Sequence, residues 1–201
     1  MKLYYSPGAC SLAPHIISQE IGLHLDLVQV DTHSHKLVNG ADFFLINPKG
    51  YVPLLEMENG ETLSEGPVIC QYLANLTPDS SLLPVDGSLA RYRVLEWQSY
   101  ISSEIHKSFI PLFHPGVDVS SKNIFAESLL KKFKWISENL SDQEYLTGNT
   151  FTIADAYLYA VTRWAAWVNL DLSGLDPLQA FMTRVTKRPA VERALRTEGL
   201  L

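Results

Sequence analysis

Residues 47–55 of this chain read Asn-Pro-Lys-Gly-Tyr-Val-Pro-Leu-Leu. The Pro-Lys-Gly portion predicts a turn, and residues 52–55 then predict the start of a short apolar strand. Pro53 has no N–H to donate to a neighbouring strand, so it belongs at the first residue of a strand or on an edge. The residue before it is held extended. If the Val52–Pro53 bond is cis, the N–H and C=O of Val52 point out of the sheet and can pair with an extended peptide.

A hairpin and a helix are expected to follow this turn. Asn59-Gly60 is a strong hairpin signal, so residues 53–57 and 61–63 are expected to pair. Ser64 or Glu65 then opens a helix. The unpaired N–H groups at a helix N-terminus bind a carboxylate, and Glu65 beside them can hold an ammonium group. One peptide's backbone, carboxylate and amine can all be held within this stretch.

The first residues of the chain predict a strand followed by a helix with a cysteine at its N-terminus. Residues 2–5 predict the strand, and residues 12–21 predict a helix from the spacing of their apolar side chains. Cys10 and Ser11 therefore lie where the partial positive charge of the helix favours an anion. A cysteine so placed can have its pKa lowered from about 8.5 to between roughly 3.5 and 7.5. The alternative is that Cys10 is only a small buried side chain and Ser11 only an N-cap.

These separated motifs resemble the glutathione transferases in their order and spacing. In that family, Val-Pro, a hairpin and (Ser/Thr)-Glu-(Gly/Ser) form the glutathione-binding half, which is built like thioredoxin with a cis proline. Residues 1–13, Met-Lys-Leu-Tyr-Tyr-Ser-Pro-Gly-Ala-Cys-Ser-Leu-Ala, are similar to the bacterial beta class in particular. The resemblance covers nearly the whole chain. It implies an α/β thioredoxin-like domain over residues 1–80 and an all-α domain over residues 88–201, joined by a Pro-, Ser-, Asp- and Gly-rich linker at residues 81–87.

The resemblance also implies which residues meet glutathione. Thioredoxin-like folds place the reactive sulfur opposite the cis proline, so Cys10 is expected to face the glutathione sulfur, with Tyr5 and Ser11 as rival donors to the thiolate. A lysine meets the glycine carboxylate in the beta class; here His35 occupies the aligned position and Lys36 follows it. The expected glutathione-binding residues are Cys10, His35, Lys36, Val52, Pro53, Glu65, Gly66, Ser99, Ser103, Glu104, Ile105 and His106.

The helical half is expected to contribute a histidine. Residues 88–109 predict one long helix with an apolar stripe and a polar stripe, the latter formed by Ser99, Ser103 and His106. A polar stripe is usually a solvated face. The resemblance instead places it across the glutathione site, with His106 hydrogen-bonding the sulfur or supplying positive potential, and with Ser99 reaching the ligand of the other subunit.

Residues 151–156 predict the start of another helix. Thr152 at the N-cap and Asp155 at the third helical position match a capping box in which Asp replaces Glu or Gln. Asp155 is therefore expected to be structural rather than catalytic. Further along the same helix, Trp164 and Tyr157 either line an apolar pocket for the second substrate between the domains or pack in the core.

Composition excludes several classes of function. The 201 residues carry a net charge of −6 without charge blocks, which argues against a nucleic-acid or anionic-membrane surface. Two cysteines and no long apolar run indicate a reduced, cytoplasmic protein without a membrane span. His33 and His35 are not expected to bind a metal, because no further cluster supplies ligands. Cys70 lies among apolar residues in a helix and is expected to be structural.

Glutathione transfer is the function that the resemblance implies. Glutathione is then a cosubstrate, no cofactor is permanently bound, the protein is a homodimer, and the thiolate attacks a small electrophilic, hydrophobic molecule. Two alternatives stay open. One is glutathione-dependent thiol–disulfide exchange or peroxidase chemistry through Cys10, which would use a single thiol because position 13 is Ala and no Cys-x-x-Cys motif is present. The other is a non-catalytic binder of apolar metabolites.

Overall fold

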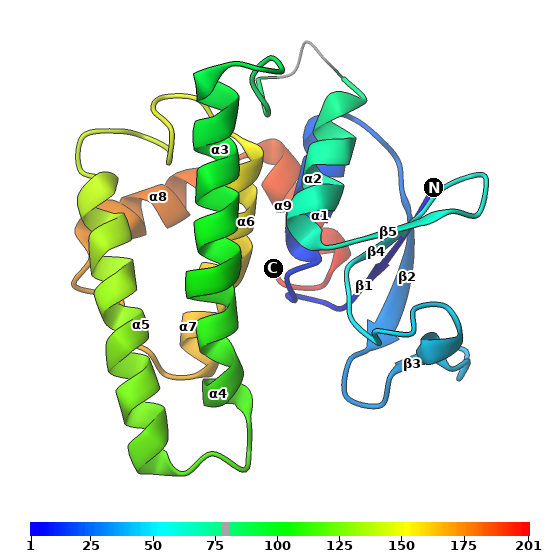
Figure 1. The fold of residues 1–201 in the computed structure, drawn as a ribbon, viewed down its shortest axis with the longest axis horizontal. Helices are drawn as coiled ribbons and strands as arrows, with labels where there is room; N and C mark the ends of the chain where they lie inside the picture. The colour runs from blue at the N-terminus through cyan, green and yellow to red at the C-terminus, as the bar shows by residue number, and fades with distance from the viewer. Residues whose placement is uncertain (78–80) are drawn as a thin grey trace. The chain divides into compact units, whose positions relative to one another are not determined.

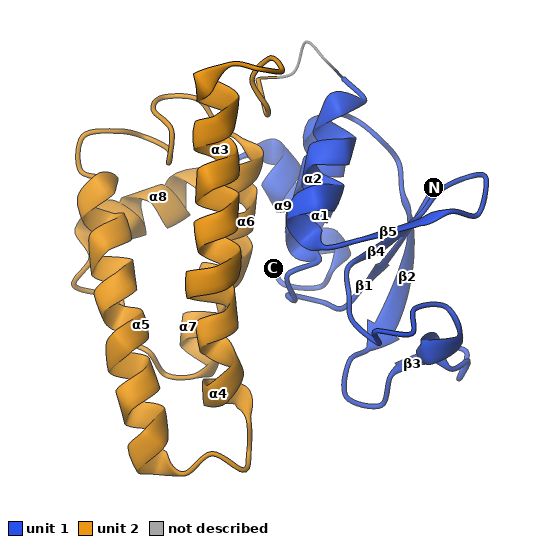
Figure 2. Cartoon of the chain, in the orientation of Figure 1, with its two compact units in different colours: residues 1–80, 188–201 blue, residues 81–187 orange. Residues whose placement is uncertain are grey.

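The computed structural model describes residues 1–77 and 81–201, and these form two compact units (Figures 1 and 2). The first unit comprises residues 1–80 with 188–201, and the second comprises residues 81–187. The expected end of the first domain falls on residues 78–80, which lie outside the described residues. Residues 188–201 were expected in the helical domain; in the structure they group with the first unit.

Within the described residues, the strands of the first unit form a five-stranded sheet in the order β3-β2-β1-β4-β5. They are β1 (Lys2–Tyr5), β2 (Asp26–Asp31), β3 (Lys36–Leu37), β4 (Leu54–Glu56) and β5 (Thr62–Ser64). β1 pairs with β2 in parallel, with the predicted helix of residues 12–21 between them in the sequence, and β4 pairs with β5 as the predicted hairpin. β3 has only two residues, which is too short to leave an alternating pattern in the sequence.

The helices of the first unit lie together on one side of its sheet (Figure 1). They are α1 (Leu12–Glu20), α2 (Gly66–Asn75) and α9 (Pro189–Thr197), and α1 packs against both of the others. A short 3₁₀ helix, η1 (Phe43–Leu45), buries Phe43 completely. The next residue, Phe44, is 44% exposed and lies beside His35.

The described part of the second unit is built from helices. These are α3 (Leu89–Tyr100), α4 (Ile110–Phe113), α5 (Val119–Asn139), α6 (Ile153–Thr162), α7 (Trp164–Trp167) and α8 (Asp176–Thr186). Between α3 and α4 the chain stays helical as the π-helix η2 (Ile101–His106) and the 3₁₀ helix η3 (Lys107–Phe109). The predicted helix over residues 88–109 is therefore continuous but changes its winding at η2. None of the helices in the described residues is long and apolar enough to cross a membrane.

Helix α6 forms the core of the second unit, because all of its residues are buried. The predicted capping box at its start is confirmed. Asp155 Oδ2 accepts hydrogen bonds from the N–H and the hydroxyl of Thr152, each at 2.8 Å, and Oδ1 accepts one from the Leu146 N–H at 2.8 Å. Burial raises the pKa of this carboxyl to about 6, against the effect of these hydrogen bonds.

The residues expected to form a linker are packed onto the second unit. Leu82 and Leu83 are buried, and the Leu82 carbonyl accepts a hydrogen bond from the N–H of Ile153 at 3.0 Å. Leu82 and Leu83 therefore belong to the core near the start of α6.

Candidate functional site

The loop between β1 and α1 presents Cys10 at the start of a helix. The turn is closed by hydrogen bonds from Ala9 N–H to the Ser6 carbonyl and from Leu12 N–H to the Ala9 carbonyl, both at 3.0 Å. Cys10 is partly exposed, and its Sγ lies 3.4 Å from the carbonyl oxygen of Val52, within hydrogen-bonding distance for a thiol. The expected reactive cysteine and the expected peptide-pairing residue, 42 positions apart in the sequence, thus meet in space.

Val52 lies just outside the sheet, beside the start of α2. The Val52–Pro53 peptide bond is cis, and β4 begins at Leu54. Across the described residues, the Val52 N–H has no hydrogen-bond partner. A Cβ added at Gly66 would lie 3.6 Å from Cγ of Pro53, so the first residue of α2 adjoins the proline ring directly. The peptide group of Val52 and the N-terminus of α2 are therefore neighbours.

Glu65 precedes α2 in a conformation that is unusual for a residue with a side chain. Its φ is 70° and its ψ is 109°. Such left-handed residues cost about 1–3 kcal/mol and cluster at ligand sites. The Nζ of Lys49 donates hydrogen bonds to Ser64 Oγ at 3.0 Å and to Glu65 Oε1 at 3.2 Å. A cation and an anion, both exposed, therefore stand at the N-terminus of α2.

Lys49 is a candidate functional residue that the sequence analysis missed. There it was interpreted only as part of the Pro-Lys-Gly turn. Its proximity to Glu65 arises from the way the turn folds back on the hairpin, and no periodic spacing connects positions 16 apart. A lysine inside the turn that leads to Val-Pro was the available signal.

His35 and Lys36 have different surroundings. His35 has a φ of 54°, its Nδ1 lies 3.0 Å from the carbonyl oxygen of Gly50, and its ring centroid lies 4.6 Å from that of Phe44. His35 therefore braces the turn before Val52. Lys36 lies in β3 and is exposed. The expected contact of either residue with the glycine carboxylate of glutathione stays a prediction.

Tyr5 and Ser11, the rivals of Cys10, are both buried. The Ser11 hydroxyl accepts a hydrogen bond from the Ser6 N–H and donates one to the Ser6 carbonyl, each at 3.2 Å. Ser11 was expected to cap α1 with its side chain, but its side chain makes no N-cap hydrogen bond there. The hydroxyl is instead hydrogen-bonded to the backbone of Ser6 within the turn. For Tyr5, burial and then the negative charge of Glu198 raise the pKa, so its hydroxyl stays protonated.

In the second unit, His106 belongs to an aromatic cluster. Its Nδ1 lies 2.6 Å from the hydroxyl oxygen of Tyr157, and its ring meets Trp164 edge-on with centroids 4.8 Å apart. Trp164 also packs edge-on against Phe109, with centroids 5.5 Å apart. Tyr157 and Trp164 are buried, whereas His106 is the partly exposed member. Because His106 ends the π-helix η2, this cluster lies at a segment of a type that is frequent at functional sites.

The other residues predicted on this helix differ in exposure. Ser99 and Ser103 are exposed, and the Ser103 hydroxyl donates to the Ser99 carbonyl at 3.1 Å. Glu104 pairs with Lys132 at 2.9 Å, and Ile105 is fully buried. Their expected contacts with glutathione stay predictions.

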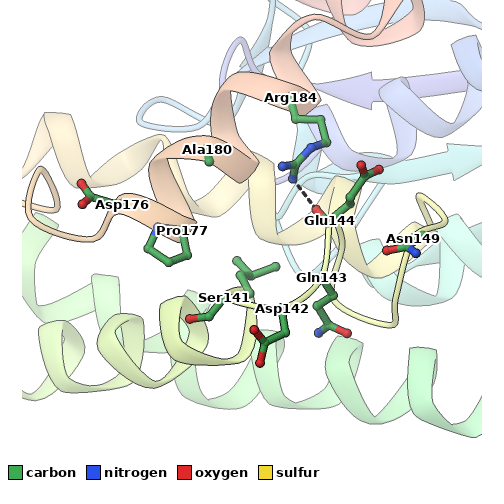
Figure 3. Close-up of a pocket in the computed structure, with 10 residues that line it drawn as sticks. Ser141, Asp142, Gln143, Glu144, Asn149, Asp176, Pro177, Ala180 and Arg184 are labelled. Carbon is green, nitrogen blue, oxygen red and sulfur yellow. Dashed lines mark hydrogen bonds between the residues drawn. The ribbon is translucent and has the colours of Figure 1, made fainter.

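Cys70 is fully buried in α2, as expected, and burial raises the pKa of its thiol. In the described residues neither Cys10 nor Cys70 forms a disulfide, and no group of His, Cys, Asp and Glu side chains is arranged to hold a metal ion. A cavity of about 480 Å³ opens in the second unit between the end of α5 and α8 (Figure 3). Its lining, which includes Asp142 and Arg184, contains none of the predicted site residues.

Comparison with known proteins decides the family. A model of the glutathione S-transferase N-terminal domain matches residues 8–76, and a model of the C-terminal domain matches residues 100–189. Glutathione S-transferase GstA of Escherichia coli O157:H7 is 48% identical over 200 residues, which cover 100% of both chains. The chain belongs to the glutathione S-transferase family.

Further relatives of this glutathione transferase have the same extent. Glutathione S-transferase GST-4.5 of Xanthomonas campestris pv. campestris is 33% identical, with 100% of both chains covered. Among solved structures, the ternary complex of BphK, a bacterial transferase, has a TM-score of 0.96 at 50% identity with full coverage of both chains. The beta-class enzyme of Sphingomonas chungbukensis has a TM-score of 0.96 at 43% identity, and a sphingomonad enzyme complexed with glutathione has 0.95 at 43%, again with full coverage.

These matches confirm the predictions made from the Val-Pro stretch and the first residues. The transferase has the predicted thioredoxin-like and helical halves, it is an enzyme of the predicted class, and its relatives include the bacterial beta class. The roles of the individual site residues in this chain stay predictions.

Proposed function

We propose that this transferase binds glutathione as an extended strand beside Val52 and conjugates its thiolate to an electrophilic, hydrophobic molecule. The observation that carries the proposal is the 3.4 Å approach of Cys10 Sγ to the Val52 carbonyl oxygen. A peptide that pairs with the Val52 backbone brings its own thiol to this position, at the N-terminus of α1. The partial positive charge there favours a thiolate.

The γ-glutamyl end of the tripeptide is assigned to the N-terminus of α2. The N–H groups at the start of this helix receive the α-carboxylate of the γ-glutamyl residue. The exposed carboxylate of Glu65 receives its ammonium group, and Lys49 adds positive charge beside the same helix. The left-handed φ of Glu65 supports this assignment, because it costs free energy that folding alone does not require.

In the reaction, the thiol of glutathione loses its proton and the thiolate sulfur forms a bond to an electrophilic carbon. The leaving group departs with its bonding electron pair, or an activated double bond takes up the pair and then a proton. Ser11 uses its hydroxyl within the turn, so Cys10 and the protonated Tyr5 are favoured as the groups that face the sulfur. The aromatic cluster of His106, Tyr157 and Trp164 supports an apolar second substrate.

Replacing Glu65 with alanine is expected to raise the KM for glutathione by about tenfold or more, because the ammonium group loses its charged partner, which contributes about 1.5–3 kcal/mol. Steady-state kinetics with a reactive aryl halide measures this effect. Glu61→Ala is the matched control, since Glu61 is also exposed and hydrogen-bonds Asn59 in the hairpin. An unchanged KM in Glu65→Ala would discredit the placement of the amine.

A second candidate function is glutathione-dependent thiol–disulfide exchange. It is favoured by the partly exposed thiol of Cys10 beside the peptide group of Val52. The Cys10 thiolate attacks the glutathione sulfur of a disulfide between glutathione and a substrate thiol, forms a mixed disulfide with glutathione and releases the substrate as a thiolate. A second glutathione thiolate then attacks the mixed disulfide and returns Cys10 to its reduced form, so that each step exchanges one S–S bond for another.

We also infer that the protein is a homodimer. In the first unit Leu45 is 86% exposed and Tyr51 is 70% exposed, and in the second unit Trp135 is 44% exposed. Sedimentation equilibrium is expected to give twice the chain mass of 22.5 kDa. Replacing both Leu45 and Tyr51 with Asp is expected to shift the protein toward the monomer, whereas Val85→Asp, also at an exposed apolar position, is not. A wild-type protein that sediments as a monomer would contradict the inference.

A further inference from the structure

The C-terminal helix α9 is fastened along α1, the helix that starts at Cys10. Nε and Nη2 of Arg188 donate hydrogen bonds to the two carboxylate oxygens of Glu20 at 2.6 and 2.9 Å. Farther along α9, Arg193 donates to the side-chain oxygen of Gln19 at 3.1 Å and to its carbonyl oxygen at 3.0 Å. Bidentate pairs of this kind fix geometry as well as distance. The far end of α9 is thereby directed toward the loop between β1 and α1.

Helix α9 ends in a geometry that fixes the direction of Glu198. The Leu200 N–H donates to the Leu195 carbonyl at 2.9 Å, and the Gly199 N–H donates to the Arg196 carbonyl at 3.1 Å. Gly199 has a φ of 69°. Together these features form a Schellman motif, in which glycine supplies the left-handed residue just after the helix. Glu198 is the C-cap residue of this motif.

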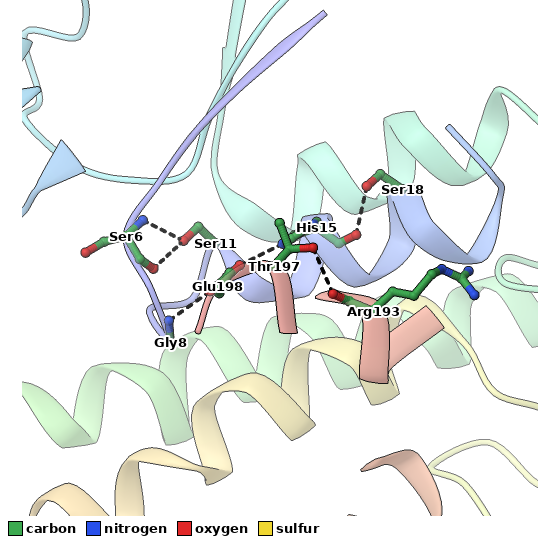
Figure 4. A network of polar contacts seen from close by, with 8 residues as sticks. All are labelled: Ser6, Gly8, Ser11, His15, Ser18, Arg193, Thr197 and Glu198. Carbon is green, nitrogen blue, oxygen red and sulfur yellow. Dashed lines mark hydrogen bonds and ion pairs between the residues drawn. The ribbon is translucent and has the colours of Figure 1, made fainter. Parts of the chain in front are cut away.

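The carboxylate of Glu198 is buried against the loop that carries Cys10 (Figure 4). Oε2 accepts a hydrogen bond from the Gly8 N–H at 2.9 Å, and Oε1 lies 2.8 Å from Nδ1 of His15. The side chains of His15 and Glu198 are 1% and 0% exposed. Gly8 lies two residues before Cys10 and His15 five residues after it, so this single carboxylate holds the chain on both sides of the thiol.

The direction of the hydrogen bond between His15 and Glu198 follows from the chemistry of the carboxylate. A carboxylate only accepts hydrogen bonds, so His15 donates from Nδ1 to Oε1 of Glu198. A buried carboxylate loses more when one of its donors is removed than an exposed carboxylate does.

We propose that Glu198 is a positioning residue for the chemistry at Cys10: from the C-terminal helix, it holds the loop between β1 and α1 in the conformation that directs the thiol at the glutathione sulfur. This inference rests on the proposed role of Cys10. Glu198 lies beyond residues 8–76 and 100–189, the parts of the chain that the two family models match. The terminal segment thereby contributes to the glutathione-binding half, although it follows the helical half in sequence.

The first test is the rate at which Cys10 forms a mixed disulfide with oxidised glutathione, followed by intact mass over a range of glutathione concentrations. Glu198→Gln keeps the size of the side chain but turns an N–H₂ group toward either the Gly8 N–H or the His15 N–H. We expect the maximal rate to fall by about tenfold while the half-saturating concentration changes by less than about twofold, because the groups that bind glutathione are intact. Glu192→Gln is the matched control, since Glu192 lies on the same helix in an exposed pair with Arg196.

The second test does not depend on glutathione. Hydrogen exchange is expected to be about tenfold faster in the peptide over residues 6–12 of Glu198→Gln, and unchanged in α2, which would report general unfolding. The proposal would be overturned if Glu198→Gln had the same hydrogen exchange over residues 6–12 and the same maximal rate of adduct formation as the wild type. If Glu198→Gln does not fold, Glu198→Asp keeps the charge on a shorter side chain and must slow adduct formation. If hydrogen exchange is faster in Glu198→Gln but the wild-type protein forms no adduct with glutathione, the result counts against the proposed role of Cys10 and not against the contact made by Glu198.

Discussion

Cys10→Ala is expected to form no covalent adduct with oxidised glutathione and to lose glutathione-dependent disulfide reduction by about a hundredfold or more. The reason is that the thiolate is the attacking group in such exchange, and alanine offers no replacement. Intact mass after incubation with oxidised glutathione measures the adduct, and a coupled assay with a small disulfide substrate measures the reduction.

Cys70→Ala is the matched control for this experiment. Cys70 is fully buried in α2, and burial raises the pKa of its thiol, so it is expected to contribute no adduct. The Cys70→Ala protein should therefore gain one glutathione, as the wild type does. An adduct that persists in Cys10→Ala would move the reactive sulfur to Cys70 and remove the basis of the proposed site.

Aryl conjugation in the same Cys10→Ala protein separates the two candidate functions. If conjugation survives while disulfide reduction is lost, the thiol serves exchange, and the N-terminus of α1 stabilises the glutathione thiolate by itself. If both activities fall together, Cys10 acts on the bound sulfur in both reactions. In either case the binding of glutathione beside Val52 is unaffected, so its KM should stay near the wild-type value.

The glutathione-binding half was predictable because its signals are local. A proline that cannot sit inside a sheet, an Asn-Gly hairpin and a cysteine at a helix N-terminus each restrict the backbone within a few residues. The structure has the strand, hairpin and helix starts that they indicate. The capping box at Thr152 and Asp155 was predictable for the same reason, since both partners lie within one helical turn.

What could not be predicted depends on contacts between distant parts of the chain. Lys49 reaches Glu65, and Glu198 reaches Gly8 over 190 positions, and no periodicity in the sequence encodes either contact. The helix over residues 88–109 showed ordinary helical spacing, yet residues 101–106 are wound as a π-helix. Nζ of Lys132, in α5, donates a hydrogen bond to the backbone carbonyl oxygen of Glu104, in η2, at 3.0 Å. Such tertiary contacts decide local winding where sequence propensity does not.

Asp155→Ala is expected to lower the free energy of unfolding by about 3–7 kcal/mol. The loss combines the helix cap, at about 1 kcal/mol, with the buried N–H groups of Leu146 and Thr152 left without an acceptor, at about 1–3 kcal/mol each. Urea denaturation followed by circular dichroism measures it. Asp142→Ala, at an exposed position of the same unit, is the control and should change stability by less than about 0.5 kcal/mol.

The pH dependence of stability tests the same carboxyl in a second way. The pKa of Asp155 is about 6 in the folded protein and 3.8 at its ordinary value. Between these values the folded state holds the proton more tightly than the unfolded state does, so the free energy of unfolding contains a term that falls as pH rises from about 4 to about 6. Asp155→Asn cannot titrate and should lack this term. Subtracting its stability curve from that of the wild type should leave a decline confined to this window, and a flat difference would mean that Asp155 is already ionised at the lower pH.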